Sequence, residues 1–249
     1  MRRTLKTLSV LLTYPSAELQ AAVPEMQAAL DADGVLTRGA RDGVGRILHE
    51  IATGDLYDVQ ERYVLLFDRT RSLSLHLFEH VHGESRDRGQ AMVDLVQLYE
   101  THGLALGTSE LPDFIPLFLE FLSAIPEADA RRTLADTVHI LAALRQRLEK
   151  RDSAYAGVFA ALEDLSAGKP DVETLDALLA GPDDDPNDLA ALDAAWMDEE
   201  VKFGPGADSA ACGTEGIASK IRAARRPAPG VVVPGPQRPV VTHTPSTRI

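Results

Sequence analysis

The sequence predicts an all-α protein, and three observations lead to this fold class. Apolar residues make up 45% of the chain but aromatic residues only 5%, so a core must consist mostly of Leu, Ala and Val, as in packed helices. Apolar residues recur at spacings of three and four up to about residue 166, which is the period of an amphipathic helix. Sustained strand alternation is missing from the sequence, and residues 231–233 (Val-Val-Val) lie among prolines, which central strands avoid.

The first two helices are predicted within the first 34 residues. The basic start of the chain resembles a secretory signal, but its apolar part is short and lacks a small-residue cleavage site, so a core helix is favoured. Ser16 can cap a second helix, which runs to about Leu30 and is broken by residues 31–34. Pro24 predicts a kink or an interruption in that helix. The stripe of the first helix consists of Leu5, Leu8 and Leu12.

Three further helices are predicted in the middle of the chain. One covers residues 36–52, and the next begins near Asp55 and is extended by Phe67. A third follows a histidine-rich stretch, is capped by Ser85 and ends at Gly103. The stripe of the helix that begins near Asp55 contains Leu56, Val59, Tyr63 and Leu66.

Three more helices are predicted before residue 168. Residues 111–116 open the first of them, with Pro112 at an early position, where its missing amide hydrogen would have no partner anyway. Asp113 caps or anchors this turn. The other two helices are marked by Leu134, Val138, Leu141 and Leu148, and by Tyr155, Val158, Phe159, Leu162 and Leu165.

The chain is predicted to form one domain followed by a tail. We place an all-helical domain at residues 1–168, an acidic linker at 169–203 and a disordered tail rich in Gly, Pro and Arg at 204–249. The linker has 11 acidic residues and no basic residue from position 171 to position 200, and a weak helix is expected near 189–197. The tail contains too little apolar surface to offset the entropy of ordering it. The linker is either a solvated spacer or a segment that docks on a basic or apolar groove.

Composition excludes several classes of function. A net charge of −13 argues against a nucleic-acid-binding protein, whose affinity comes largely from cations on phosphate. It also disfavours adsorption to anionic lipid, and no apolar run reaches the length of about 18 residues needed to span a bilayer. Cys212 is the only cysteine, so a disulfide within the chain is impossible and a reducing cytoplasm is the expected setting.

The histidine-rich stretch at residues 74–95 is the main candidate site, and its histidines are His76, His80 and His82. A zinc protease places glutamate directly after its first histidine, whereas Leu77 follows His76. A di-iron bundle needs Glu-x-x-His on two helices, and here the spacing occurs once, at Glu79 and His82. The stretch is therefore a metal site, a set of helix caps and ion pairs, or a polar surface that binds a ligand without chemistry. We favour the last of these.

Other motifs give no positive case for catalysis. Residues 43–45 (Gly-Val-Gly) lie inside a helical pattern and do not indicate a nucleotide site. Asp113 and Glu120 could share a helix face, but no nucleophile or cofactor motif accompanies them. Arg86 and Arg88 either join an ion-pair network or bind an anion, since guanidinium groups hold carboxylate and phosphate with two hydrogen bonds.

Four blocks of this sequence resemble the nitrate reductase assembly chaperones, the NarJ-type branch of the TorD-like family of redox-enzyme maturation chaperones. The blocks cover most of residues 8 to 125. They are Leu11-Leu-Thr-Tyr-Pro-Ser16, Tyr63-Val-Leu-Leu-Phe-Asp68, the stretch from Leu73 through His76-Leu-Phe-Glu-His-Val-His-Gly-Glu-Ser-Arg-Asp-Arg-Gly89 to Leu95, and Leu111-Pro-Asp-Phe-Ile-Pro-Leu-Phe-Leu-Glu-Phe-Leu122.

The resemblance implies a non-catalytic, cytoplasmic, all-helical chaperone without a retained cofactor. Its expected partner is the catalytic (alpha) subunit of respiratory nitrate reductase, including the N-terminal segment of that subunit. The chaperone would hold this client open for insertion of the molybdenum cofactor before membrane docking, and molybdenum cofactor delivery proteins would be further partners. No nucleic acid and no stable membrane insertion are expected.

The client peptide is expected to bind along the second, third and fourth blocks. Aromatic side chains would contact apolar client residues, and carboxylates would meet basic ones. The residues assigned to this surface are Tyr63, Phe67, His76, Phe78, Glu79, His80, His82, Glu84, Arg86, Asp87, Asp113, Pro116 and Glu120. Two alternatives remain: a helical metalloenzyme that uses the three histidines, and a scaffold that acts through its tail.

Overall fold

The computed structural model describes residues 1–82, 86–107 and 110–181, together with residues 183, 185, 188 and 190. Its helices belong to one compact unit, Met1–Ala195, and residues 196–249 lie outside the described part. The helices are α1 (Arg2–Leu11), α2 (Ala17–Asp33), α3 (Arg38–Thr53), α4 (Leu56–Phe67), the 3-10 turn η1 (Arg71–Leu73), α5 (Leu77–His82), α6 (Arg86–Thr101), α7 (Ile115–Ala124), α8 (Glu127–Lys150), α9 (Ala156–Leu165) and α10 (Val172–Leu179).

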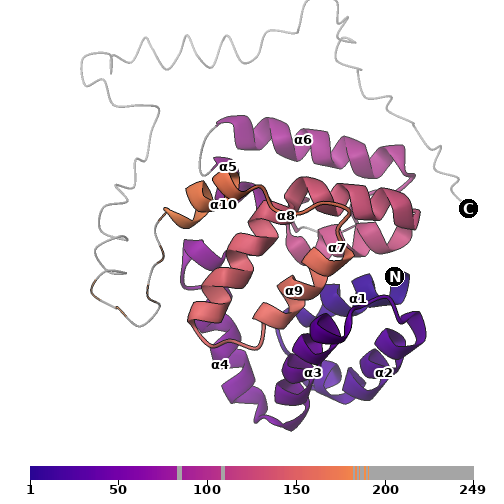
Figure 1. Ribbon diagram of the computed structural model, residues 1–249, viewed down its shortest axis with the longest axis vertical. Helices are drawn as coiled ribbons and strands as arrows, with labels where there is room; N and C mark the ends of the chain where they lie inside the picture. The colour runs from indigo at the N-terminus through magenta and orange to yellow at the C-terminus, as the bar shows by residue number, and fades with distance from the viewer. Residues whose placement is uncertain are drawn as a thin grey trace, which may run out of the picture. The chain divides into compact units, whose positions relative to one another are not determined.

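The predicted all-α class is confirmed for the first unit (Figure 1). Within the described ranges the only β-type pairing is one isolated bridge between His76 and Phe114. The predicted tail and the weak helix expected near 189–197 fall outside those ranges. No described helix is long and apolar enough to cross a membrane.

Side-chain caps begin several helices where the sequence predicted them. The hydroxyl of Ser16 accepts from the amide of Leu19, and the carboxylate of Asp55 accepts from the amide of Tyr57. These bonds satisfy amides that have no partner within their own helix. The helix after Ser16 runs past Pro24 without the predicted interruption and ends at Gly34, whose φ of 59° is the left-handed conformation that glycine adopts readily.

One predicted helix start was wrong. Residues 112 and 113 form a turn, and α7 begins only at Ile115, so the proline near its first position is Pro116 and not Pro112. Asp113 therefore stands before the helix, where its carboxylate can reach another part of the chain. The linker prediction also did not include α10, which lies earlier than the helix expected there.

The core forms where α1 packs on α7, α3 on α9, and α8 on α9. Leucine dominates it, as the scarcity of aromatic residues requires; Leu8, Leu11, Leu119, Leu144 and Leu162 are fully buried. α3 and α9 cross at two glycines. A Cβ on Gly157 would lie 2.4 Å from the carbonyl oxygen of Gly43, closer than atoms in contact can approach, so this crossing excludes larger side chains.

Candidate functional site

Asp113 lies at the centre of the candidate site and is fully buried. One oxygen of its carboxylate accepts from the amide of Phe78 at 3.1 Å, and its carbonyl oxygen accepts from the amide of Leu77 at 3.0 Å. Both amides belong to the first turn of α5, where they have no partner within the helix. The turn before α7 therefore caps α5, a short helix that lies 35 residues earlier in the sequence.

Two cationic or potentially cationic side chains approach the same carboxylate. Nδ1 of His76 donates to one oxygen of Asp113 at 3.2 Å, and the guanidinium of Arg88 lies 3.8 Å from the other. Nε of Arg88 is buried and has no hydrogen-bond partner among the described residues. The amide of Ile115 also donates to the carbonyl of Leu75 at 2.8 Å. The third and fourth sequence blocks are thus joined by backbone and side-chain bonds.

Ser74 organises the other side of α5. Its hydroxyl donates to the carboxylate of Glu79, and its carbonyl oxygen accepts from Nε2 of His80 at 2.8 Å. Burial lowers the pKa of His80 and the nearby charge of Arg147 acts in the same direction, whereas the bond to Ser74 opposes the shift. Burial thus favours the neutral form of His80, whose ring donates to the carbonyl of Ser74.

Tyr99 on α6 completes the cluster and was not predicted from the sequence. Its hydroxyl donates to the carbonyl of Pro112 at 2.6 Å, and its ring packs against Phe121 with centroids 4.4 Å apart. Burial raises the pKa of Tyr99 and the charge of Asp113 adds to this, so the phenol stays protonated. In the sequence Tyr99 appears only as one apolar position of an amphipathic helix, and that pattern does not indicate its hydrogen bond.

We call the set Ser74, His76, Glu79, His80, Arg88, Tyr99 and Asp113 the Asp113 cluster. Four of the predicted peptide-binding residues belong to it: His76, Glu79, His80 and Asp113. The backbone of a fifth, Phe78, is bound by Asp113, and the ring of Phe78 is half-buried against the core. Arg88, Ser74 and Tyr99 are members that the predicted list did not contain.

The remaining predicted residues lie elsewhere or outside the described side chains. Pro116 is buried, and its carbonyl accepts from the hydroxyl of Ser9, which ties α7 to α1. Glu120 is 58% exposed and pairs with Lys6 at 3.2 Å. Asp87 is exposed in the first turn of α6. The side chains of His82, Glu84 and Arg86 are not among those described.

Tyr63 and Phe67 form an aromatic cluster of their own on α4. The ring of Tyr63 packs against Tyr14 and Phe67, and Phe67 meets Tyr155 edge-on with centroids 5.0 Å apart. The hydroxyl of Tyr63 donates to the carbonyl of Leu12, at the end of α1. Both residues are only 8% exposed, so packing accounts for much of their role.

The described part of the chain contains no group of three or more His, Cys, Asp or Glu side chains placed to hold a metal ion. The nitrogens of His76 and His80 that face the protein are already bonded to Asp113 and Ser74. What the cluster can do is hold α5 and the turn before α7 as one rigid wall with polar groups along it.

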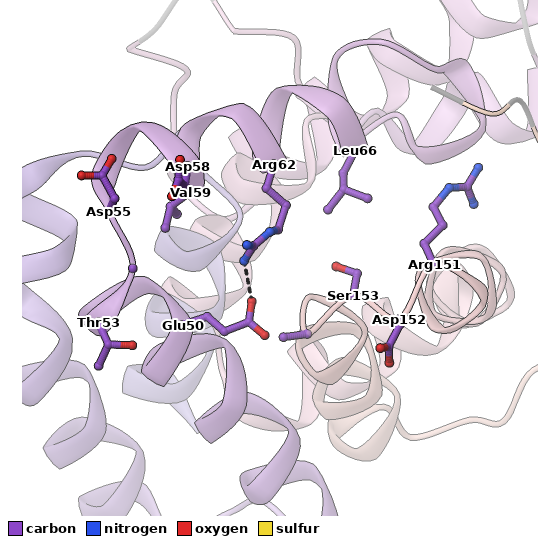
Figure 2. A pocket seen from close by; sticks show the side chains of 12 residues that line it. Glu50, Thr53, Asp55, Asp58, Val59, Arg62, Leu66, Arg151, Asp152 and Ser153 are labelled. Carbon is purple, nitrogen blue, oxygen red and sulfur yellow. Dashed lines mark hydrogen bonds and ion pairs between the residues drawn. The ribbon is translucent and has the colours of Figure 1, made fainter. Parts of the chain in front are cut away.

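A separate cavity of about 620 Å³ lies between the end of α3, α4 and the turn after α8, and shares no lining residue with the Asp113 cluster (Figure 2). Its walls carry both charges: Arg62 pairs with Glu50 at 2.9 Å, and Asp58 and Arg151 also line it. Asp152 at its edge has a φ of 51°.

Comparison with known proteins identifies the family. The family model described as "Nitrate reductase delta subunit" matches residues 14–161. The chain belongs to this family. The match covers the second, third and fourth sequence blocks and the end of the first. The resemblance inferred from those blocks is thereby confirmed at the level of the family.

Three relatives of this chain carry the names of assembly chaperones. The nitrate reductase molybdenum cofactor assembly chaperone NarJ of Escherichia coli strain K12 is 46% identical over 197 residues, which are 78% of this chain and 82% of NarJ. "Probable nitrate reductase molybdenum cofactor assembly chaperone NarW" of the same strain is 38% identical over 199 residues, or 80% of this chain and 83% of NarW. A NarJ of Bacillus subtilis strain 168 is 34% identical over 169 residues, covering 65% of this chain and 89% of that protein.

Proposed function

We propose that this protein is a non-catalytic chaperone of the cytoplasm that assists molybdenum cofactor assembly in a nitrate reductase. Its client is the catalytic (alpha) subunit of the respiratory enzyme, which it binds through the subunit's N-terminal segment and keeps competent for cofactor insertion before membrane docking. Molybdenum cofactor delivery proteins are its further partners. Membership in the nitrate reductase delta subunit family, with relatives named as assembly chaperones, supports this function.

The Asp113 cluster is the observation that best supports the proposed binding of a client peptide. Asp113 holds two separate sequence blocks together, because its buried carboxylate accepts from the amide of Phe78 and its carbonyl oxygen accepts from the amide of Leu77. Such a wall is suited to recognition because its polar groups are fixed before a ligand arrives, which lowers the entropic cost of binding. An amphipathic client helix would place its apolar side against the half-buried Phe78, with its polar side facing His76 and Glu79.

Isothermal calorimetry with a synthetic peptide of the client's N-terminal segment tests the function directly. We expect a dissociation constant in the micromolar range or tighter, and no heat from a scrambled peptide of the same composition. The variant Asp113→Asn keeps the shape of the side chain but removes its charge, and we expect weaker peptide binding while the fold is retained. Absence of binding to the wild-type protein across pH 6 to 8 would refute the peptide-binding function.

The metalloenzyme alternative is separated by metal analysis of protein purified without a histidine tag. The chaperone function predicts less than about a tenth of an equivalent of zinc or iron, whereas a structural or catalytic site requires a stoichiometric ion. One equivalent of bound metal in the wild-type protein, lost in the variant His76→Ala, would favour the metalloenzyme.

A further inference from the structure

The segment after α9 turns back and follows α8 along its length. The amide of Ala167 donates to the carbonyl of Arg131 at 3.0 Å, and a Cβ on Gly168 would lie 3.0 Å from the Cβ of Ala135. Further along, the guanidinium of Arg147 donates to the carbonyl of Leu178 at 2.7 Å. The points of contact on α8 advance in the same direction as the segment: Arg131 and Ala135 are neighbours four residues apart, and Arg147 lies further along the helix.

The two charged ends of this segment match basic residues of α8. Near its start, Asp171 interacts electrostatically with His139. At its end, Asp183 forms ion pairs with Arg151 at 2.8 Å and with Lys150 at 3.5 Å. The acidic stretch, for which the sequence left a solvated spacer and a docked segment open, is therefore matched at its end by the basic residues Lys150 and Arg151. We call residues 166–183 the strap.

The strap is held much more weakly than the helices beneath it. None of the residues of α10 is buried, whereas α9, directly before it, buries most of its residues. The apolar side of α10, formed by Leu175, Leu178 and Leu179, is only half-buried. Of the two ion pairs of Asp183, the one with Lys150 is formed by an exposed lysine, and such pairs stabilise a fold little. Segments with so little buried surface open locally long before the whole domain unfolds.

One buried side chain joins the strap to the Asp113 cluster. Arg147 is 5% exposed, and while one of its terminal nitrogens binds Leu178 of α10, the other donates to the carbonyl of Ser72 in η1 at 2.8 Å. Ser72 lies two residues before Ser74, whose carbonyl binds His80, and the charge of Arg147 acts on His80. The guanidinium of Arg147 therefore connects the strap with the wall of the candidate site.

We propose that the strap is a detachable internal ligand, and that a second part of the client segment, beyond the part that meets Phe78, binds on α8 as a short amphipathic helix in the place of α10. The surface fits a helix with an apolar side like that of α10 and carboxylates that reach Arg147, Lys150 and Arg151. Displacement of α10 removes the Leu178 carbonyl from Arg147. Because the same guanidinium also binds the carbonyl of Ser72, the loss of this bond affects the segment that contains Ser72. This proposal rests on the chaperone function proposed above.

Hydrogen–deuterium exchange on the full-length protein tests whether the strap detaches. In the free protein, amides of residues 172–180 should exchange severalfold faster than those of α8 and α9. The variant Asp183→Lys removes both ion pairs and should accelerate exchange of the strap alone. Asp176→Lys is the matched control, because it changes the charge equally on the same strap, while Asp176 is exposed and makes no ion pair with any described residue. Equal exchange of the strap in both variants and the wild type would overturn the detachable strap.

Calorimetry with the client peptide tests the displacement. Asp183→Lys should bind the peptide severalfold more tightly than the wild type, since less of the strap must be removed, and Asp176→Lys should bind as the wild type does. With saturating peptide, exchange of residues 172–180 should rise while α8 becomes more protected. Binding that leaves the strap unchanged would overturn the displacement but keep the chaperone function. A peptide that binds none of the three proteins would instead refute the function, and the exchange comparison of the two variants would still decide whether the strap detaches.

Discussion

The carboxylate of Asp113 is itself out of reach of water and interacts with groups of three other residues. It is fully buried, accepts from the amide of Phe78 and the ring of His76, and lies 3.8 Å from the guanidinium of Arg88. A buried carboxylate is costly unless it is hydrogen-bonded, and removal of one member of such a group leaves the others without compensation. Glu120, from the same sequence block, is exposed and pairs only with Lys6.

At the residue scale, we therefore expect opposite outcomes for these two acids. Asp113→Ala should lower the free energy of unfolding by about 3 kcal/mol, because an amide and a guanidinium lose a buried partner. Glu120→Ala should change it by less than about 1 kcal/mol, as exposed ion pairs do. Urea unfolding followed by circular dichroism measures both. Similar losses for the two variants would contradict the central position of Asp113.

His80 gives a second prediction at this scale. Because burial keeps its pKa below the ordinary value, the unfolded chain takes up a proton on His80 at a higher pH than the folded protein does. The contribution of neutral His80 to the free energy of unfolding is therefore complete above about pH 6.5 and decreases as the pH falls below that value. His80→Gln retains a donor for the Ser74 carbonyl and should reduce the loss of thermal stability between pH 7.5 and 5.5. His49→Gln, at an exposed position, should leave that loss unchanged.

At the scale of elements, sequence signals sufficed where they act locally. Ser16 and Asp55 each bond to an amide two or three residues away, so the sequence alone predicts the helix starts. Asp113 also looked like a cap, but the helix that it caps lies 35 residues earlier, and only the fold brings the two together. For the strap, the sequence left two alternatives open, a solvated spacer and a segment that docks on a groove, because sequence order does not place the acids beside Lys150 and Arg151.

Gly43 is a further residue whose role depends on a contact with a distant part of the chain. The sequence excluded a nucleotide site there but offered no other role, since the contact partner is Gly157, on a helix more than a hundred residues later. The candidate site could be predicted only in part, again because some of its residues are brought together by the fold and not by sequence order. Family resemblance selected His76 and Asp113, whereas Tyr99 and Arg88 join the cluster through tertiary contacts.

The crossing of α3 and α9 gives a prediction at this scale. Gly157→Ala would place a Cβ 2.4 Å from backbone atoms of Gly43, so the helices must move apart and the variant should lose about 3 kcal/mol or more. Gly45→Ala, on the same helix α3, meets no atom within 4 Å and should gain about 0.5–1 kcal/mol from helix propensity. Thermal denaturation of the two variants measures the contrast, and equal effects would contradict the close crossing.

At the scale of the whole molecule, function is expected to belong to the first unit. The family model ends at residue 161, and every described contact of the Asp113 cluster lies within Met1–Ala195. Deletion of residues 204–249 should therefore leave the affinity for the client peptide within about twofold of the full-length value, a difference of well under 1.4 kcal/mol. Calorimetry on the shortened and complete chains measures this. Loss of binding on deletion would instead support a scaffold that acts through its tail.

The strap has a consequence for how clients are chosen. A ligand tethered next to its own surface competes at a fixed effective concentration, which for short flexible connections is in the millimolar range. Any helix that binds α8 must therefore compete with the tethered strap, and this competition does not depend on the concentration of the chaperone. Apolar segments of unrelated nascent chains bind α8 too weakly to displace the strap. Only a sequence matched to the surface binds tightly enough. The weakly held α10 thus works as a filter for selectivity, since discrimination grows when the wrong partner faces a cost that the right one overcomes.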